Sequence, residues 1–73
     1  MPSMMNGLRV TVNGAARDVP AGLSVAGLLR ELGLHPGLVV VEHNREILER
    51  SRVGETEVHE GDVFEIVHFV GGG

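Results

Sequence analysis

Polar and apolar positions alternate in the first regular stretch of the chain. In LRVTVN (residues 8–13) every second side chain is apolar, which is the period of a strand with one buried face. The dipeptide Asn13-Gly14 follows, and it favours a type I′ turn because both residues tolerate a positive φ. The pattern therefore predicts a hairpin whose second strand runs to about Val19 and ends at Pro20.

The hydrophobic period changes to that of a helix in LSVAGLLRELGLHPG (residues 23–37). Apolar residues spaced i, i+3, i+4 and i+7 would share one helix face: Val25, Leu28, Leu29 and Leu32. Ser24 is a suitable N-cap, and Gly33 stands where a left-handed C-cap is expected. Leu34 can make the apolar contact that closes such a cap, so we expect one helix between Ser24 and Gly33.

Two further strands are predicted in the second half of the chain. LVVVEHNREIL (residues 38–48) is apolar enough for a central strand, and Asn44-Arg45 is expected to turn it back into a short segment at 46–48. The stretch from 49 to 58 is polar and irregular and is compatible with one helical turn. HEGD forms a turn, and VFEIVHFV (residues 63–70) is the last strand, which leads directly into three glycines.

The order of these elements predicts an α+β protein with a β-grasp fold. We expect a mixed sheet of four to five strands with one main helix packed on one face, and the last strand beside the first. The chain would divide into a loose N-terminal segment (residues 1–7), a β-grasp domain (8–70) and a flexible glycine tail (71–73).

Composition and charge narrow the classes of function. The 73 residues make one domain, and the absence of cysteine excludes disulfides and thiolate metal sites. A net charge of -4 without a basic run argues against nucleic-acid binding and would suit a partner with a basic docking face. All six basic residues are arginine. We find no membrane-spanning stretch and no signal peptide, and therefore expect a cytoplasmic protein.

The last strand has two chemically different faces. Phe64 and Ile66 share one face, and Glu65 belongs to the other, which should face solvent because an unpaired carboxylate is costly in a core. Val67 and Phe69 then become exposed apolar side chains beside the tail. They are either ordinary surface residues or part of a protein interface, and the residues alone leave both open.

The tail can carry one kind of chemistry. Gly71, Gly72 and Gly73 have no side chains, so together they could enter a slot too narrow for any other residue. The reactive group would be the carboxylate of Gly73, which becomes an electrophile once another enzyme adenylates it. A sulfur donor could then replace AMP and leave a thiocarboxylate. The competing explanation is that the glycines are only a linker or a remnant of cloning.

Other polar residues predict no catalytic or metal site. The four histidines lack metal-ligand spacing: His35, His43, His59 and His68. We place His68 on the core side near the strand end. Four acidic residues are expected to form a solvated edge: Glu55, Glu57, Glu60 and Asp62. No pair of groups stands out as general acid and base, so the chain is not expected to be an enzyme in its own right.

Several stretches together resemble the ThiS family, the sulfur carriers of thiazole formation in bacterial thiamin biosynthesis. They are VNG, LSVAGLLRELGL, VVVEHNREIL and HEGDVFEIVHFVGGG, and the resemblance covers residues 8–73. It implies a ubiquitin-like β-grasp fold. It also implies that Gly73, preceded by Gly72 and Gly71, is adenylated by a ThiF-type adenylyltransferase and converted to a thiocarboxylate, whose sulfur a ThiG-type thiazole synthase consumes.

The resemblance further implies that the open sheet face meets the activating enzyme together with the tail. The partner-binding residues are then Glu65, Val67, Phe69 and Gly71. No cofactor would be bound to this chain. ATP and a sulfur donor, such as a cysteine desulfurase, would be used by the partner enzymes.

Three alternatives remain open. The small subunit of molybdopterin synthase has the same fold and the same thiocarboxylate, although the HNREI segment looks more like ThiS. A ubiquitin-type modifier would attach through Gly73, and the absence of lysine would prevent chains built on its own side chains. A plain binding module would make no use of the glycines.

Overall fold

The computed structural model describes residues 7–69. The elements in chain order are β1 (Gly7–Val12), β2 (Ala15–Pro20), α1 (Val25–Glu31), η2 (Pro36–Leu38), β3 (Val39–His43), β4 (Glu46–Leu48), η3 (Arg50–Arg52) and β5 (Val63–His68), where η2 and η3 are 3-10 helices. The predicted strands, helix and single helical turn are all present. β1 already includes Gly7, which we had assigned to the loose segment.

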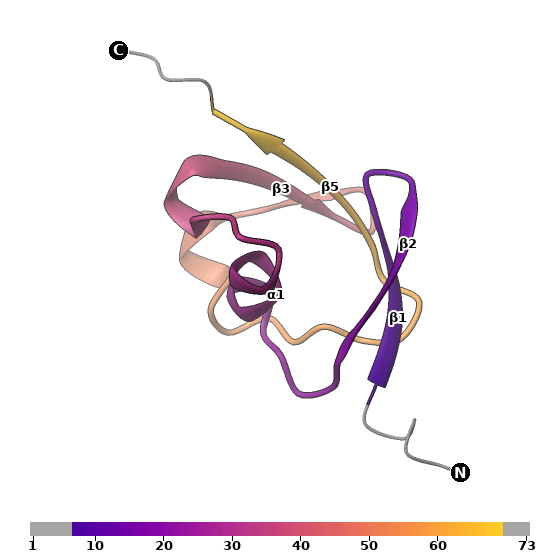
Figure 1. Ribbon diagram of the computed structural model, residues 1–73. Helices are drawn as coiled ribbons and strands as arrows, with labels where there is room; N and C mark the ends of the chain where they lie inside the picture. The colour runs from indigo at the N-terminus through magenta and orange to yellow at the C-terminus, as the bar shows by residue number, and fades with distance from the viewer. Residues whose placement is uncertain (1–6, 70–73) are drawn as a thin grey trace, which may run out of the picture.

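The described strands form one mixed sheet in the order β2-β1-β5-β3-β4. β5 pairs parallel with β1 and antiparallel with β3, while each hairpin is antiparallel within itself. Figure 1 shows α1 inside the concave side of the twisted sheet, with β5 running between β3 and β1. The prediction of a mixed sheet with the last strand beside the first is confirmed.

In both hairpins the first central residue of the turn is an asparagine. Asn13 and Gly14 have φ values of 49° and 84°, and Asn44 and Arg45 have φ values of 52° and 74°. Positive φ at both central residues is the geometry of a type I′ turn, which matches the twist of the flanking strands. The two turns therefore place β1 beside β2 and β3 beside β4 through local chemistry alone.

The predicted caps of α1 are confirmed. The side-chain oxygen of Ser24 accepts a hydrogen bond from the Gly27 N–H at 3.1 Å. At the other end Gly33 has φ 79°, and its N–H donates to the carbonyl of Arg30 at 2.9 Å. The Leu34 N–H donates to the carbonyl of Leu29 at 2.8 Å, which completes a Schellman motif.

The core lies between α1 and the covered face of the sheet. Phe64, Leu28 and Leu29 are fully buried at its centre. The long connection from 49 to 62 also contributes to the core, which its polar sequence did not indicate, because Val53 and Val58 are buried. Backbone bonds tie this connection to the start of the helix: the carbonyl of Val53 accepts from Ala26 and the N–H of Val58 donates to Leu23.

Candidate functional site

The three glycines of the predicted reactive tail, Gly71, Gly72 and Gly73, lie outside the described residues. The structure does place the strand that precedes them. β5 is an interior strand, paired with β3 as far as His68, and the Phe69 N–H donates to the Leu38 carbonyl at 2.8 Å. The last described residue is therefore still bonded to the residue that directly precedes β3.

The face of β5 that we predicted to be open is exposed. Val67 has 63% of its surface accessible and Phe69 has 45%, and Glu65 is also exposed. Phe64 and Ile66 point to the opposite, helix-covered side and are buried. The structure thus brings three of the four predicted partner-binding residues to one surface, and the fourth, Gly71, lies outside the described residues. Their contact with a partner stays a prediction.

Residues of β3 and β4 extend this open face, and sequence reasoning missed them. In the strand register Val40 lies opposite Val67, and Ile47 lies on the far side of Glu42 from Glu65. Ile47 is 64% exposed. We call Val40, Glu42, Ile47, Glu65, Val67 and Phe69 the open face. Only the register could have shown this grouping, because its members come from three separate strands.

The open face is acidic at its centre. Glu42 and Glu65 are direct cross-strand neighbours, and like charges in such positions repel. None of the ion pairs among residues 7–69 involves either of them. At one margin the guanidinium carbon of Arg50 lies 6.0 Å from the centre of the Phe69 ring, at the outer limit of a cation–π contact.

Asp62 corrects the prediction of a solvated acidic edge. Glu55, Glu57 and Glu60 are exposed as expected, but Asp62 is only 7% exposed. A buried carboxylate must be hydrogen-bonded or it is strongly destabilising. Its position in a turn rich in acidic residues gave no signal of this burial.

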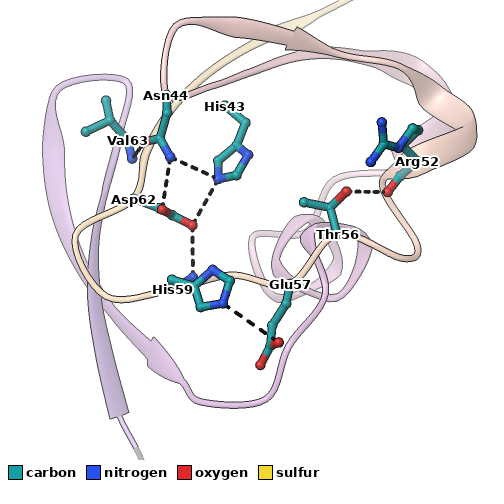
Figure 2. A network of polar contacts seen from close by, with 8 residues as sticks. All are labelled: His43, Asn44, Arg52, Thr56, Glu57, His59, Asp62 and Val63. Atoms are coloured by element: carbon teal, nitrogen blue, oxygen red, sulfur yellow. Dashed lines mark hydrogen bonds and ion pairs between the residues drawn. The ribbon is translucent and has the colours of Figure 1, made fainter.

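A small polar network surrounds the Asp62 carboxylate (Figure 2). One oxygen accepts from the His59 N–H at 2.9 Å and from His43 Nε2 at 3.0 Å, and the other accepts from Asn44 Nδ2 at 3.1 Å. The Asn44 side-chain oxygen in turn accepts from the Val63 N–H at 2.9 Å. The network joins the β3–β4 turn to the start of β5.

The network also fixes protonation states. Because the carboxylate accepts from His43 Nε2, that nitrogen carries the proton. The His43 ring stacks on Phe64, with ring centroids 5.0 Å apart. Burial by itself raises the pKa of Asp62, but the bonds from His59, Asn44 and His43 outweigh it and hold that pKa below its usual value. The carboxylate therefore stays ionised as a structural acceptor.

The remaining histidines are dispersed. The Nδ1 atom of His35 accepts a hydrogen bond from the Gly37 N–H at 3.0 Å. The Nε2 atom of His59 lies 3.8 Å from a carboxylate oxygen of Glu57. His68, which we placed on the core side, is exposed because β5 has passed the end of the core there. Residues 7–69 contain no group of three side chains placed to hold a metal ion, and no helix among them is long and apolar enough to cross a membrane.

Comparison with known proteins gives consistent matches. The model of the ThiS family matches residues 10–73. The chain is 46% identical over 50 residues to the sulfur carrier protein ThiS of Bacillus subtilis, covering 68% of this chain and 76% of that protein. It is also 41% identical over 66 residues to a thiazole synthase of Paramagnetospirillum magneticum, covering 90% of this chain but 20% of that protein. The chain thus spans about a fifth of that larger relative.

Solved structures agree with the fold. A crystal structure of a thiamine biosynthesis protein (ThiS) from Geobacter metallireducens is similar with a TM-score of 0.75 and 39% identity, covering 90% of this chain and all of that one. A designed protein based on human ubiquitin is similar with a TM-score of 0.54 and 20% identity, covering 94% of this chain and 98% of that one. The second match supports the ubiquitin-like β-grasp fold alone.

Proposed function

Because the chain belongs to the ThiS family, we propose that it is a sulfur carrier of thiamine biosynthesis rather than an enzyme in its own right. The observation that carries this proposal is the family match, which extends through the glycines to residue 73. The identity to a protein named as a sulfur carrier supports it.

The proposed chemistry takes place at Gly73. A ThiF-type adenylyltransferase joins the Gly73 carboxylate to the AMP of ATP and releases pyrophosphate. A sulfide equivalent then attacks the acyl carbon and displaces AMP, which leaves a thiocarboxylate. This chain supplies the acyl group and its presentation, while the partner enzymes supply ATP and the sulfur donor, such as a cysteine desulfurase.

The proposed consumer of the sulfur is a ThiG-type thiazole synthase. In the relative from Paramagnetospirillum magneticum a segment similar to this chain forms part of a protein named thiazole synthase. The occurrence of a similar segment within a larger thiazole synthase supports a functional link between this chain and an enzyme of that type. All of these steps would take place in the cytoplasm.

The open face is the proposed docking surface for the activating enzyme. Val67 and Phe69 supply exposed apolar area in the part of the chain that leads to the glycines. Glu42 and Glu65 supply negative charge, and neither forms an ion pair with another residue among 7–69. A partner with apolar side chains and a guanidinium group would complement this surface.

Intact mass tests the proposed function. The protein is incubated with ATP, a ThiF-type enzyme and hydrosulfide, and a gain of about 16 Da is expected from the exchange of oxygen for sulfur. A variant lacking Gly73 should gain nothing while remaining folded. No mass change with an enzyme that activates its own carrier would refute the proposal. Conjugation to another protein would instead indicate a ubiquitin-type modifier.

The identity of the consuming enzyme separates the two sulfur pathways. The thiocarboxylate form is supplied in parallel to a thiazole synthase and to the large subunit of molybdopterin synthase. Sulfur transfer only to the thiazole synthase is expected. Transfer only to the molybdopterin enzyme would contradict the thiamine assignment while leaving the carrier chemistry intact.

A further inference from the structure

Two asparagine side chains hold β5 from opposite sides. The amide oxygen of Asn13 accepts from the Ile66 N–H at 2.7 Å, and its Nδ2 donates to the Ile66 carbonyl at 3.2 Å. Asn44 makes a similar contact nearer the start of the strand, where its oxygen accepts from the Val63 N–H at 2.9 Å. Both asparagines have positive φ in tight hairpin turns.

The Asn13 contact continues a strand ladder beyond the end of its strand. β1 and β5 pair in parallel at Thr11–Val63 and Val12–Phe64, and the Asn13 N–H donates to the Phe64 carbonyl at 2.8 Å. The chain then turns away into β2. A side-chain amide presents a C=O acceptor beside an N–H donor, as a backbone does, so the Asn13 side chain takes the place of the next backbone partner of β5.

We call the two hydrogen bonds between the Asn13 side chain and Ile66 the Asn13 clamp. The clamp lies just past the point where the ladder between β1 and β5 ends. Figure 1 shows β5 running on past the β1–β2 turn toward its C-terminal end. After Ile66 the ladder contacts of β5 are with β3 and its neighbour: Val67 with Val40, His68 with Val39, and the Phe69 N–H with the Leu38 carbonyl. Among residues 7–69, the Asn13 side chain therefore makes the last hydrogen bonds to β5 from the β1 side.

We propose that Asn13 is a positioning residue for the carrier reaction: its amide holds the end of β5 so that Val67 and Phe69 meet the activating enzyme in one fixed arrangement. This inference rests on the proposed function. Without the Asn13 contact, the end of β5 would have to become ordered when the partner binds. This ordering costs free energy, so the affinity for the partner falls. The chemistry at Gly73 is unchanged once the complex has formed, so kcat is unaffected.

Three variants separate positioning from general stability. Asn13→Gly removes the amide and accepts the positive φ of 49°, which keeps the turn. Asn13→Asp keeps the acceptor for the Ile66 N–H but sets an oxygen against the Ile66 carbonyl. Asn44→Gly is the matched control, because it removes the clamp at the other end of β5 together with the bond to Asp62.

The first readout is amide hydrogen exchange at the end of β5. Asn13→Gly should speed exchange at Ile66, Val67 and Phe69 by roughly 5- to 30-fold, as expected for the loss of one or two hydrogen bonds. Asn44→Gly should leave exchange at Val67 and Phe69 unchanged. Protection at these two amides that is the same in Asn13→Gly and in the natural protein would overturn the inference, whether or not the chain is a carrier.

The second readout is the adenylation reaction with a ThiF-type enzyme. Asn13→Gly should raise the KM for the carrier by roughly fivefold or more, with kcat within about twofold of the natural value. The KM of Asn13→Asp should lie between those of Asn13→Gly and the natural protein. Asn44→Gly should keep the natural KM although it loses more contacts. An equal rise in KM for both glycine variants would assign the effect to stability and overturn the positioning role. A natural protein that is not adenylated refutes the proposed function, and the exchange readout then still decides on the clamp.

Discussion

Replacing Asp62 by asparagine should destabilise the protein in a way that depends on pH. The carboxylate accepts from three donors, on His59, Asn44 and His43. An asparagine keeps the shape but loses one acceptor and gains a donor. Asn44 cannot compensate by turning its amide over, because its oxygen already accepts from the Val63 N–H. At least one buried donor is therefore left without a partner.

The expected loss follows from the contacts. A buried donor left unsatisfied costs about 1–3 kcal/mol, and hydrogen bonds to charged groups lie at the upper end of this range. We expect Asp62→Asn to lose about 2 kcal/mol, which for a domain of this size lowers Tm by roughly 8–16 °C. A chain of 73 residues has a total stability of about 4–11 kcal/mol, so the loss is a large fraction of it.

The sign of the pH dependence follows from the lowered pKa of Asp62. Because this pKa is lower in the folded than in the unfolded chain, the stabilisation is fully present above the unfolded value of about 3.9. It is lost as the pH falls through the folded pKa. The natural protein and Asp62→Asn should therefore differ most near neutral pH and converge in strong acid.

Urea unfolding at pH 7 and at pH 3 measures the difference in stability between the natural protein and Asp62→Asn. Circular dichroism is the suitable signal, because the chain has no Trp or Tyr whose fluorescence could report unfolding. Glu55→Gln is the matched control, because Glu55 lies in the same acidic stretch, is exposed, and forms an ion pair with Arg52 on the surface. It should change the free energy of unfolding by less than about 0.5 kcal/mol. Equal stability of Asp62→Asn and the natural protein at pH 7, or a difference that persists unchanged in acid, would refute the reasoning.

Three further substitutions test other parts of the structure. Leu28→Ala should lower the free energy of unfolding by about 3–4 kcal/mol in urea titrations, because the Leu28 side chain of α1 is fully buried in the core. Gly33→Ala should lower it by about 1–2 kcal/mol from the positive φ of 79° alone, since a Cβ there would meet no atom within 4 Å. Val67→Asp should change it by less than about 1 kcal/mol but raise the KM for the activating enzyme about tenfold, because it adds negative charge to an apolar part of the open face.

Local sequence signals predicted the elements because each element is encoded by neighbouring residues. Asn13-Gly14 requires only its own two φ values, and Ser24 and Gly33 act on backbone groups within one turn of the helix. The face of β5 that carries Glu65 and Val67 followed from the strand period in the same way. These features were predictable because no distant partner decides them.

The features that sequence reasoning missed depend on distant partners. Asp62 resembles Glu60 in the sequence, and two of the three donors on its carboxylate, His43 and Asn44, come from β3 and its turn. Val58 is an isolated apolar residue in a polar stretch, and it is buried because that stretch packs on the start of α1. Hydrophobic period cannot identify residues whose partners lie many positions away.

The place of β5 in the sheet links folding to the proposed function. The strand order β2-β1-β5-β3-β4 means that β5 joins the two hairpins, which share no ladder with each other within residues 7–69. Both hairpins also clamp β5 with an asparagine from their turns. The segment that leads to the glycines is therefore the segment on which the sheet depends, and the open face exists only once β5 has docked. In the proposed carrier reaction, the open face would therefore be complete only when the strand that leads to the glycines is in place in the sheet.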